Sequence, residues 1–150
     1  FIEKAIKGRK NSGLILEDKL GNKKIAHAHA SLVDIGSPDS DIFGYVWAKF
    51  YDTNNIFLNF NKMQEKNYWL FFRGHDHCSS VLSIPAKGQA SLADYSEVIQ
   101  FEGQLKLQND RKYIITVGAF IEGQYAVLDS TKKTLEFKQT SHPSKIAGTP

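Results

Sequence analysis

The chain has 150 residues, of which 41% are hydrophobic and 12% aromatic, so it can bury the core of one domain and is not a disordered polypeptide. Its net charge is only +3 and its lysines are scattered, which argues against the basic stripe that nucleic-acid backbones require. The single cysteine, Cys78, excludes an intrachain disulfide, and no apolar run reaches the ~20 residues that span a bilayer, so we expect a soluble cytoplasmic domain.

The first half of the chain is predicted to be mainly helical. Residues 1–9 place apolar side chains at helical spacing and predict the end of an amphipathic helix. Residues 25–31, "IAHAHAS", alternate as a strand does, after a turn at "GNKK". Two further helices are expected at 42–50 and 53–66, since apolar residues recur there every three or four positions.

The period of the apolar pattern changes from about 3.6 to 2 near Tyr68. "YWLFF" at 68–72 is a continuously apolar run, typical of a strand buried on both faces. The turn residues "DSTKK" predict a hairpin, and residues 140–150 form a polar tail. The other strands are expected within the segments 81–84, 97–107, 113–117, 124–129 and 134–139. Helices followed by a β-rich half predict an α/β (α+β) domain of stacked sheets flanked by helices.

Four of the five histidines form two His-X-His pairs, His27 with His29 and His75 with His77. In an extended segment, side chains two positions apart project from the same face, so each pair can direct two imidazoles at one point. Neutral imidazole is a good ligand for zinc and iron, and added carboxylates favour manganese. The second pair directly follows a glycine, Gly74, at the end of the apolar strand, where α/β proteins commonly build their sites.

Some of these residues have a plain structural interpretation. His27 lies deeper in its strand and can be a buried, hydrogen-bonded histidine, while His142 lies in the polar tail and is expected to be inert. Cys78 adjoins the second pair but has no activating base other than histidines that would be bound to metal, so we expect it to be structural.

Three segments of the chain resemble those of calcineurin-like metallophosphoesterases, in the same order. "GHDH" at 74–77 is similar to the family's Gly-His-X-His motif after an apolar strand. "IAHAHASLVDIGSPDSDIFGYVW", from Ile25, resembles the preceding motif, in which a strand ends in a metal-binding histidine. "YIITVGAFIEGQYAVLD", from Tyr113, resembles the closing strand, turn and strand. The resemblance covers about residues 25–138.

The resemblance implies a role for individual positions. His29 and His75 match ligands of one divalent metal ion, and His77 matches a ligand of a second; the ions would be manganese, iron or zinc. Gly74 would allow a close backbone approach to the site. Asp76 does not match a ligand and is either an outer partner that orients an imidazole or a solvated loop carboxylate.

The chain also departs from the family pattern. The family's glycine turn usually contains Asn-Pro-Gly-Ser, whereas this chain has "TVGAF". The family's Asp-X-His, Gly-Asp-X-X-Asp and Gly-Asn-His-Asp/Glu motifs, which supply the bridging aspartate and the proton-donating histidine, have no counterpart here. We therefore expect residues 1–150 to be the C-terminal half of a four-layer αββα metallophosphoesterase sandwich, with no proton donor of its own.

The function that this resemblance implies is hydrolysis of phosphomonoesters or phosphodiesters by a water activated between two metal ions. The substrate would be a small phosphoester or a phosphoprotein, and the N-terminal half of the same domain would be the partner that completes the site. Two alternatives stay open: a non-catalytic β-rich binding or regulatory domain, and a mononuclear zinc site with three histidine ligands.

Overall fold

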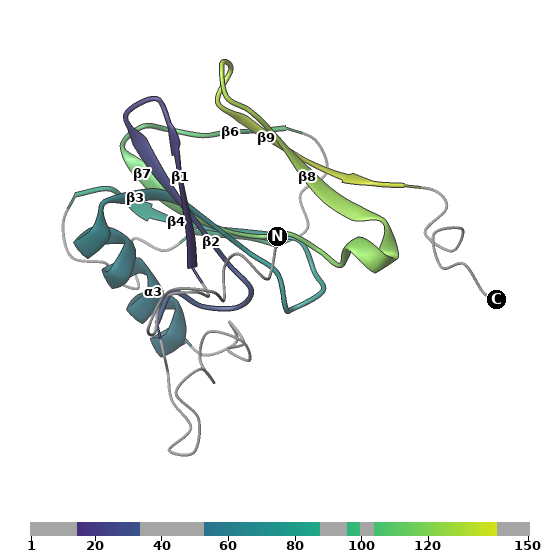
Figure 1. Ribbon diagram of the computed structural model, residues 1–150, viewed down its shortest axis with the longest axis horizontal. Coiled ribbons are helices and arrows are strands. Elements are labelled where there is room, and N and C mark those ends of the chain that lie inside the picture. The colour runs from purple at the N-terminus through teal and green to yellow at the C-terminus, as the bar shows by residue number, and fades with distance from the viewer. Residues whose placement is uncertain (1–14, 34–52, 88–95, 100–103, 141–150) are drawn as a thin grey trace.

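The computed structural model describes residues 15–33, 53–87, 96–99 and 104–140 (Figure 1). In these ranges the chain forms nine strands, one α-helix and one short 3₁₀ helix. In chain order they are β1 (Ile15–Leu20), β2 (Lys23–Ala28), α3 (Thr53–Lys66), β3 (Tyr68–Arg73), β4 (Ser80–Pro85), β5 (Ser96–Ile99), β6 (Gln104–Lys106), β7 (Arg111–Thr116), η2 (Phe120–Glu122), β8 (Gln124–Asp129) and β9 (Thr134–Gln139).

The described strands form two sheets. The larger has six strands in the order β1-β2-β3-β7-β4-β5, and the smaller has three in the order β6-β9-β8. Within the larger sheet, β2, β3 and β7 are parallel neighbours, and the outer pairs are antiparallel. The carboxyl ends of β2, β3 and β7 therefore meet at one edge, which is where open sheets of this kind place their sites.

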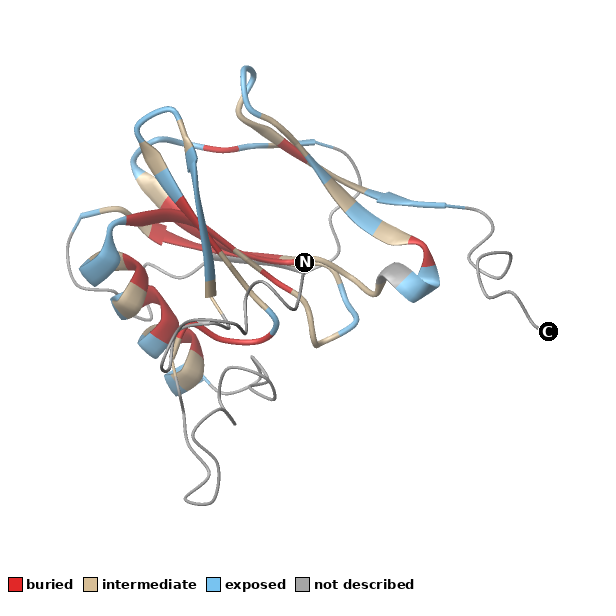
Figure 2. Ribbon diagram, viewed as in Figure 1, coloured by how far each residue is buried: buried red, intermediate tan, exposed pale blue. Residues whose placement is uncertain are grey.

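Helix α3 covers one face of the larger sheet (Figure 1). Ile56, Phe60 and Met63 lie on one side of the helix, because they are spaced by four and three residues, and they pack against Phe71 and Ile114 of the central strands. Phe60 and Met63 are fully buried. This apolar side, coloured as buried in Figure 2, attaches the helix to the sheet.

The smaller sheet packs on the opposite face, where Leu135 meets residues of the central strands. A bulge shapes this face: Lys24 pairs with Tyr68 but Ile25 pairs with Leu70, so β3 carries one extra residue, Trp69. Trp69 and Leu70 consequently both contribute to the same core although they are neighbours in sequence. The described part is thus layered as helix, sheet and sheet.

Several sequence expectations are confirmed and others are corrected. The helix at 53–66 and the strand at 68–72 are found, as is the hairpin of β8 and β9. The predicted strand 25–31 ends earlier, at Ala28, and β1 was not expected. The expected strand 97–107 is two strands, β5 and β6, which belong to different sheets.

The expected helices at 1–9 and 42–50, and the polar tail from 141 onward, lie outside the described residues. No helix in the described part of the chain is long and apolar enough to cross a membrane.

Candidate metal site

A cleft of about 340 Å³ opens at the edge where β2, β3 and β7 end. His29 lies just beyond β2, and Gly74, His75 and His77 lie in the loop that follows β3. The rest of its lining comes from Val117, Gly118, Ala119 and Ile121, which follow β7. The parallel pairing of the three strands therefore brings together segments that are more than 80 positions apart in sequence.

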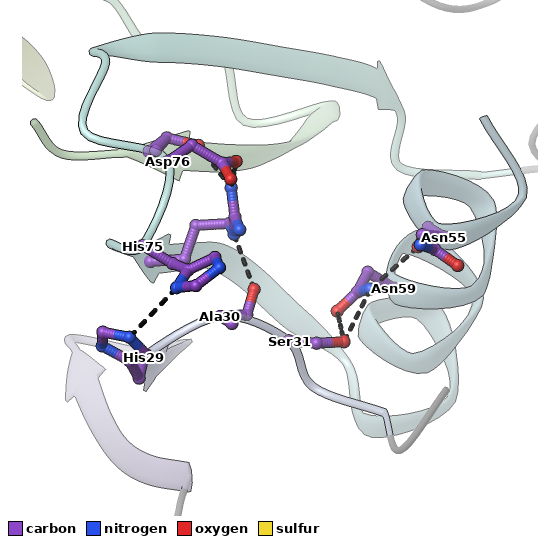
Figure 3. A network of polar contacts seen from close by, with 9 residues as sticks. His29, Ala30, Ser31, Asn55, Asn59, His75 and Asp76 are labelled. Carbon is purple, nitrogen blue, oxygen red and sulfur yellow. Dashed lines mark hydrogen bonds and ion pairs between the residues drawn. The ribbon is translucent and has the colours of Figure 1, made fainter. Parts of the chain in front are cut away.

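His29 and His75 are in direct contact (Figure 3). The distance from His29 Nε2 to His75 Nδ1 is 3.3 Å, and the rings meet edge to face with centroids 5.2 Å apart. His29 is exposed and His75 is half-buried. The structure thus joins two of the three histidines predicted as ligands, 46 positions apart in sequence.

The loop that carries His75 has an uncommon backbone. His75 has a φ of 72° and His77 a φ of 53°, both in the left-handed region that residues with a Cβ seldom adopt. The amide of Asp76 donates a hydrogen bond to the carbonyl of Gly74, which closes a three-residue turn around His75. Such conformations cost about 1–3 kcal/mol and concentrate at functional sites, where the fold imposes them.

His77 lines the same cleft but is not part of the contact between His29 and His75. Its side chain is 59% exposed, and its Nδ1 is 4.0 Å from the Oε1 of Glu122 in η2. Among the described residues there is no group of three His, Cys, Asp or Glu side chains that could hold a metal ion. Glu122 was not singled out from the sequence, since nothing in "FIEG" marks it before η2 places it beside His77.

His27 is not among the residues that line the cleft, and it is half-buried. Its ring stacks on Phe72 with centroids 5.4 Å apart, and burial lowers its pKa, while the Asp18 carboxylate acts in the opposite direction. Cys78 is exposed, and His142 is outside the described residues.

Lack of space does not require a glycine at position 74. A Cβ added at this position would lie 3.7 Å from the carbonyl oxygen of His29, which is an ordinary van der Waals contact. The close approach expected at Gly74 is instead a hydrogen bond, because its amide donates to that same oxygen at 2.9 Å.

Asp76 pairs with Arg73. The carboxylate Oδ2 accepts a hydrogen bond from Arg73 Nη1, and both side chains are almost fully buried. Asp76 is therefore not the solvated loop carboxylate that one interpretation expected, and its carboxylate pairs with a guanidinium and not with an imidazole. Arg73 was missed from the sequence; its only signal is a charge at the end of the apolar run "YWLFF".

A second buried contact fixes the segment that follows His29. Asn59 of α3 is fully buried, and its Oδ1 accepts a hydrogen bond of 2.7 Å from the amide of Leu32. Its Nδ2 donates to the hydroxyl of Ser31 at 2.9 Å and to the carbonyl of Asn55 (Figure 3). The helix thus holds the chain where it leaves β2, two residues beyond His29.

Comparison with known proteins identifies the fold. No protein-family model matches the sequence, and no curated protein matches it. Among solved structures, a metallophosphoesterase from Sphaerobacter thermophilus is similar with a TM-score of 0.59 and 19% identity, over 86% of this chain and 48% of that one. A hypothetical protein from Pyrococcus horikoshii OT3 is similar with a TM-score of 0.51 and 11% identity, over 89% of this chain and 42% of that one.

The chain therefore has an α+β fold similar to that of a metallophosphoesterase, which is the fold that the resemblance of its three segments predicted. It spans about half the length of the two structures, 48% and 42%.

Proposed function

We propose that this chain is part of a metal-dependent phosphoesterase, in which His29 and His75 bind one divalent ion and His77 binds a second. The observation that carries the proposal is the contact between His29 and His75 at the carboxyl ends of two parallel strands of a metallophosphoesterase-like fold. Loops at this edge of such sheets are the usual place for a site.

The histidine pair fits a shared metal ion. Ligand nitrogens about 2.0–2.1 Å from a tetrahedral zinc ion lie roughly 3.3–3.4 Å from each other. The observed separation of 3.3 Å has this value, and it lies just beyond the roughly 2.7–3.2 Å that is usual for hydrogen bonds from N–H groups to oxygen. To bind one ion, both facing nitrogens must be deprotonated, with the proton of each ring on its other nitrogen.

The chain's own residues would contribute orientation and ligand strength. His29 and His75 present their facing nitrogens from loops that the sheet holds together, and the carboxylate of Glu122 lies 4.0 Å from the Nδ1 of His77, where its negative charge would favour a bound cation. Two bound divalent ions would supply a water of lowered pKa and would neutralise charge on phosphoryl oxygens. Three imidazoles are too few for two ions, so we propose that the N-terminal half of the same domain supplies the carboxylates and the proton donor.

The substrate class that we propose is a phosphomonoester or phosphodiester, carried by a small molecule or a phosphoprotein. The metal ions would be manganese, iron or zinc. We place the activity in the cytoplasm, where an exposed thiol such as that of Cys78 stays reduced.

The test measures metal content and hydrolysis of p-nitrophenyl phosphate and bis(p-nitrophenyl) phosphate by the protein in its natural length. We expect two ions per domain, and we expect His75→Ala to lower metal content and turnover together because a ligand is lost. His142→Ala is the matched histidine control and should change neither. Hydrolysis that persists unchanged in His75→Ala after metal removal would refute the proposal.

The same measurements separate the two alternatives. One zinc ion per chain, lost on mutation of any one of the three histidines, would identify a mononuclear site. A protein that binds no metal and hydrolyses neither compound would be a binding or regulatory domain on the same fold.

A further inference from the structure

The guanidinium of Arg73 lies between the two loops that carry the candidate ligands. Arg73 is the last residue of β3 and is only 2% exposed. Its Nε donates to the carbonyl of Ala30 at 2.6 Å, and its Nη1 donates to the hydroxyl of Thr116 at 3.1 Å and to the carboxylate of Asp76. One side chain thus holds the segments that follow β2 and β3 and the end of β7.

Two of these three partners of Arg73 are each next to one of the histidines His29 and His75. Ala30 directly follows His29, and Asp76 directly follows His75. The guanidinium is planar with donors at fixed angles, so its hydrogen bonds to Ala30 and Asp76 constrain both the separation and the orientation of the two segments. A lysine at this position would offer a point charge on a flexible stem and could not impose the same angles.

The buried ion pair is not explained by stability alone. Burying Arg73 and Asp76 removes two charges from water, a cost that their attraction often only offsets, and well-packed apolar side chains are commonly as stable. The second carboxylate oxygen, Asp76 Oδ1, is buried without a hydrogen-bond partner within the described part of the chain. The unsatisfied acceptor adds to the free-energy cost of burying the pair, so stability alone is a weak reason for this pair.

We propose that Arg73, acting through Ala30 and Asp76, is a positioning residue that holds His29 and His75 at ligand separation before a metal ion binds. The inference deepens the proposed function and rests on it for the metal itself, whereas the hydrogen bonds of Arg73 and the 3.3 Å separation of the two imidazoles are independent of that proposal. Outer partners of metal ligands typically change metal affinity by about 10–100-fold when they are altered.

The test uses Arg73→Lys in the protein in its natural length, with Arg111→Lys as the matched control. Arg111 lies at the opposite end of β7, where its guanidinium binds the side chain and carbonyl of Ser83. Two quantities are measured: inter-ring NMR contacts between His29 and His75 without metal, and the affinity and visible spectrum of bound Co²⁺. Circular dichroism and thermal unfolding establish that each variant is folded.

For Arg73→Lys we expect loss of the inter-ring contacts, Co²⁺ affinity lowered by about 10–100-fold and a changed Co²⁺ spectrum. Arg111→Lys should retain all three, since it leaves the contacts of Arg73 in place. If Arg73→Lys does not fold, Asp76→Asn is decisive: it keeps the side-chain shape, weakens the charge-assisted bond, and should lower the affinity by about 10-fold.

The inference would be overturned if a folded Arg73→Lys variant kept the inter-ring contacts and a Co²⁺ affinity within twofold of the parent. If Arg73→Lys does not fold, the same result in Asp76→Asn would overturn it. So would a parent protein that shows no contact between the two rings. A parent that shows the ring contact, loses it in Arg73→Lys and binds no Co²⁺ would support the positioning role while refuting the proposed metal function.

Discussion

The amide of Gly74 donates a hydrogen bond of 2.9 Å to the carbonyl of His29, so the two loops of the candidate site are joined through the main chain. The last paired residues of the parallel strands before this contact are Ala28 and Arg73. The bond extends the ladder of β2 and β3 by one step beyond the strand ends. The 3.3 Å separation of His29 and His75 is therefore set by the register of the sheet as well as by the side chains.

His27 and His29 should respond differently to mutation. His29→Ala removes a proposed ligand and should weaken metal binding by more than the roughly 100-fold that marks the upper range for outer partners. His27→Ala removes a ring stacked on Phe72 and should cost about 0.5–1.5 kcal/mol of stability with little change in metal affinity. Calorimetric metal titration and urea unfolding of both variants measure the two effects. Equal losses of metal affinity would contradict the assignment.

The helix and the buried strands could be predicted because their patterns are local. Ile56, Phe60 and Met63 recur at helical spacing, and all three are buried in the structure. Strand β1 could not be predicted, since most of its residues are exposed and its extended state comes from pairing with β2. The division of 97–107 between two sheets likewise depends on partners that no local pattern specifies.

The candidate site was predictable only in part, for a related reason. The two His-X-His pairs are visible in the sequence, and the structure brings one histidine of each into contact. The backbone of His77 is left-handed, so the rule that side chains two positions apart in an extended segment share a face does not apply to His75 and His77. Arg73 gave only the signal of a charge at the end of an apolar run, because two of its partners, Ala30 and Thr116, are each 43 positions away.

The buried amide of Asn59 should contribute measurably to stability. Asn59→Ala leaves the amide of Leu32 and the hydroxyl of Ser31 without this partner inside the fold, which should cost about 1–3 kcal/mol. Asn61→Ala, at an exposed position on the same helix, should stay within about 0.5 kcal/mol of the parent. Urea unfolding provides both values, and a loss of similar size in the two variants would show that the buried contact is not responsible.

The apolar side of α3 gives an independent test of the helix-on-sheet layer. Phe60→Ala should lower the free energy of unfolding by about 3–5 kcal/mol, because a fully buried ring is lost and a cavity remains. Leu58→Ala is the control, since Leu58 is 45% exposed and should contribute little. A small effect at Phe60, measured by urea unfolding, would mean that the helix does not pack as described.

The protein should lose stability above pH 10 partly through Tyr68. Burial, together with the hydrogen bond that its hydroxyl donates to Glu17, raises the pKa of Tyr68 above its ordinary value of 10.0. Below pH 10 the phenol is protonated in both states, so its contribution to stability is fully present. As the pH rises above 10, the unfolded chain releases this proton first, so the free energy of unfolding falls.

Tyr68→Phe should therefore be less stable than the parent near neutral pH, by about 1–3 kcal/mol, because it lacks the hydrogen bond to a charged group. Between about pH 9 and 11.5, however, the variant should lose less stability than the parent does. Tyr125→Phe, which removes a hydroxyl from an exposed side chain, should keep the pH dependence of the parent. Urea unfolding at half-unit pH steps measures all three proteins. The dependence should not vanish in Tyr68→Phe, because burial also raises the pKa of Tyr113. If the curves of Tyr68→Phe and the parent run parallel across this range, the hydroxyl of Tyr68 is not held protonated by the fold.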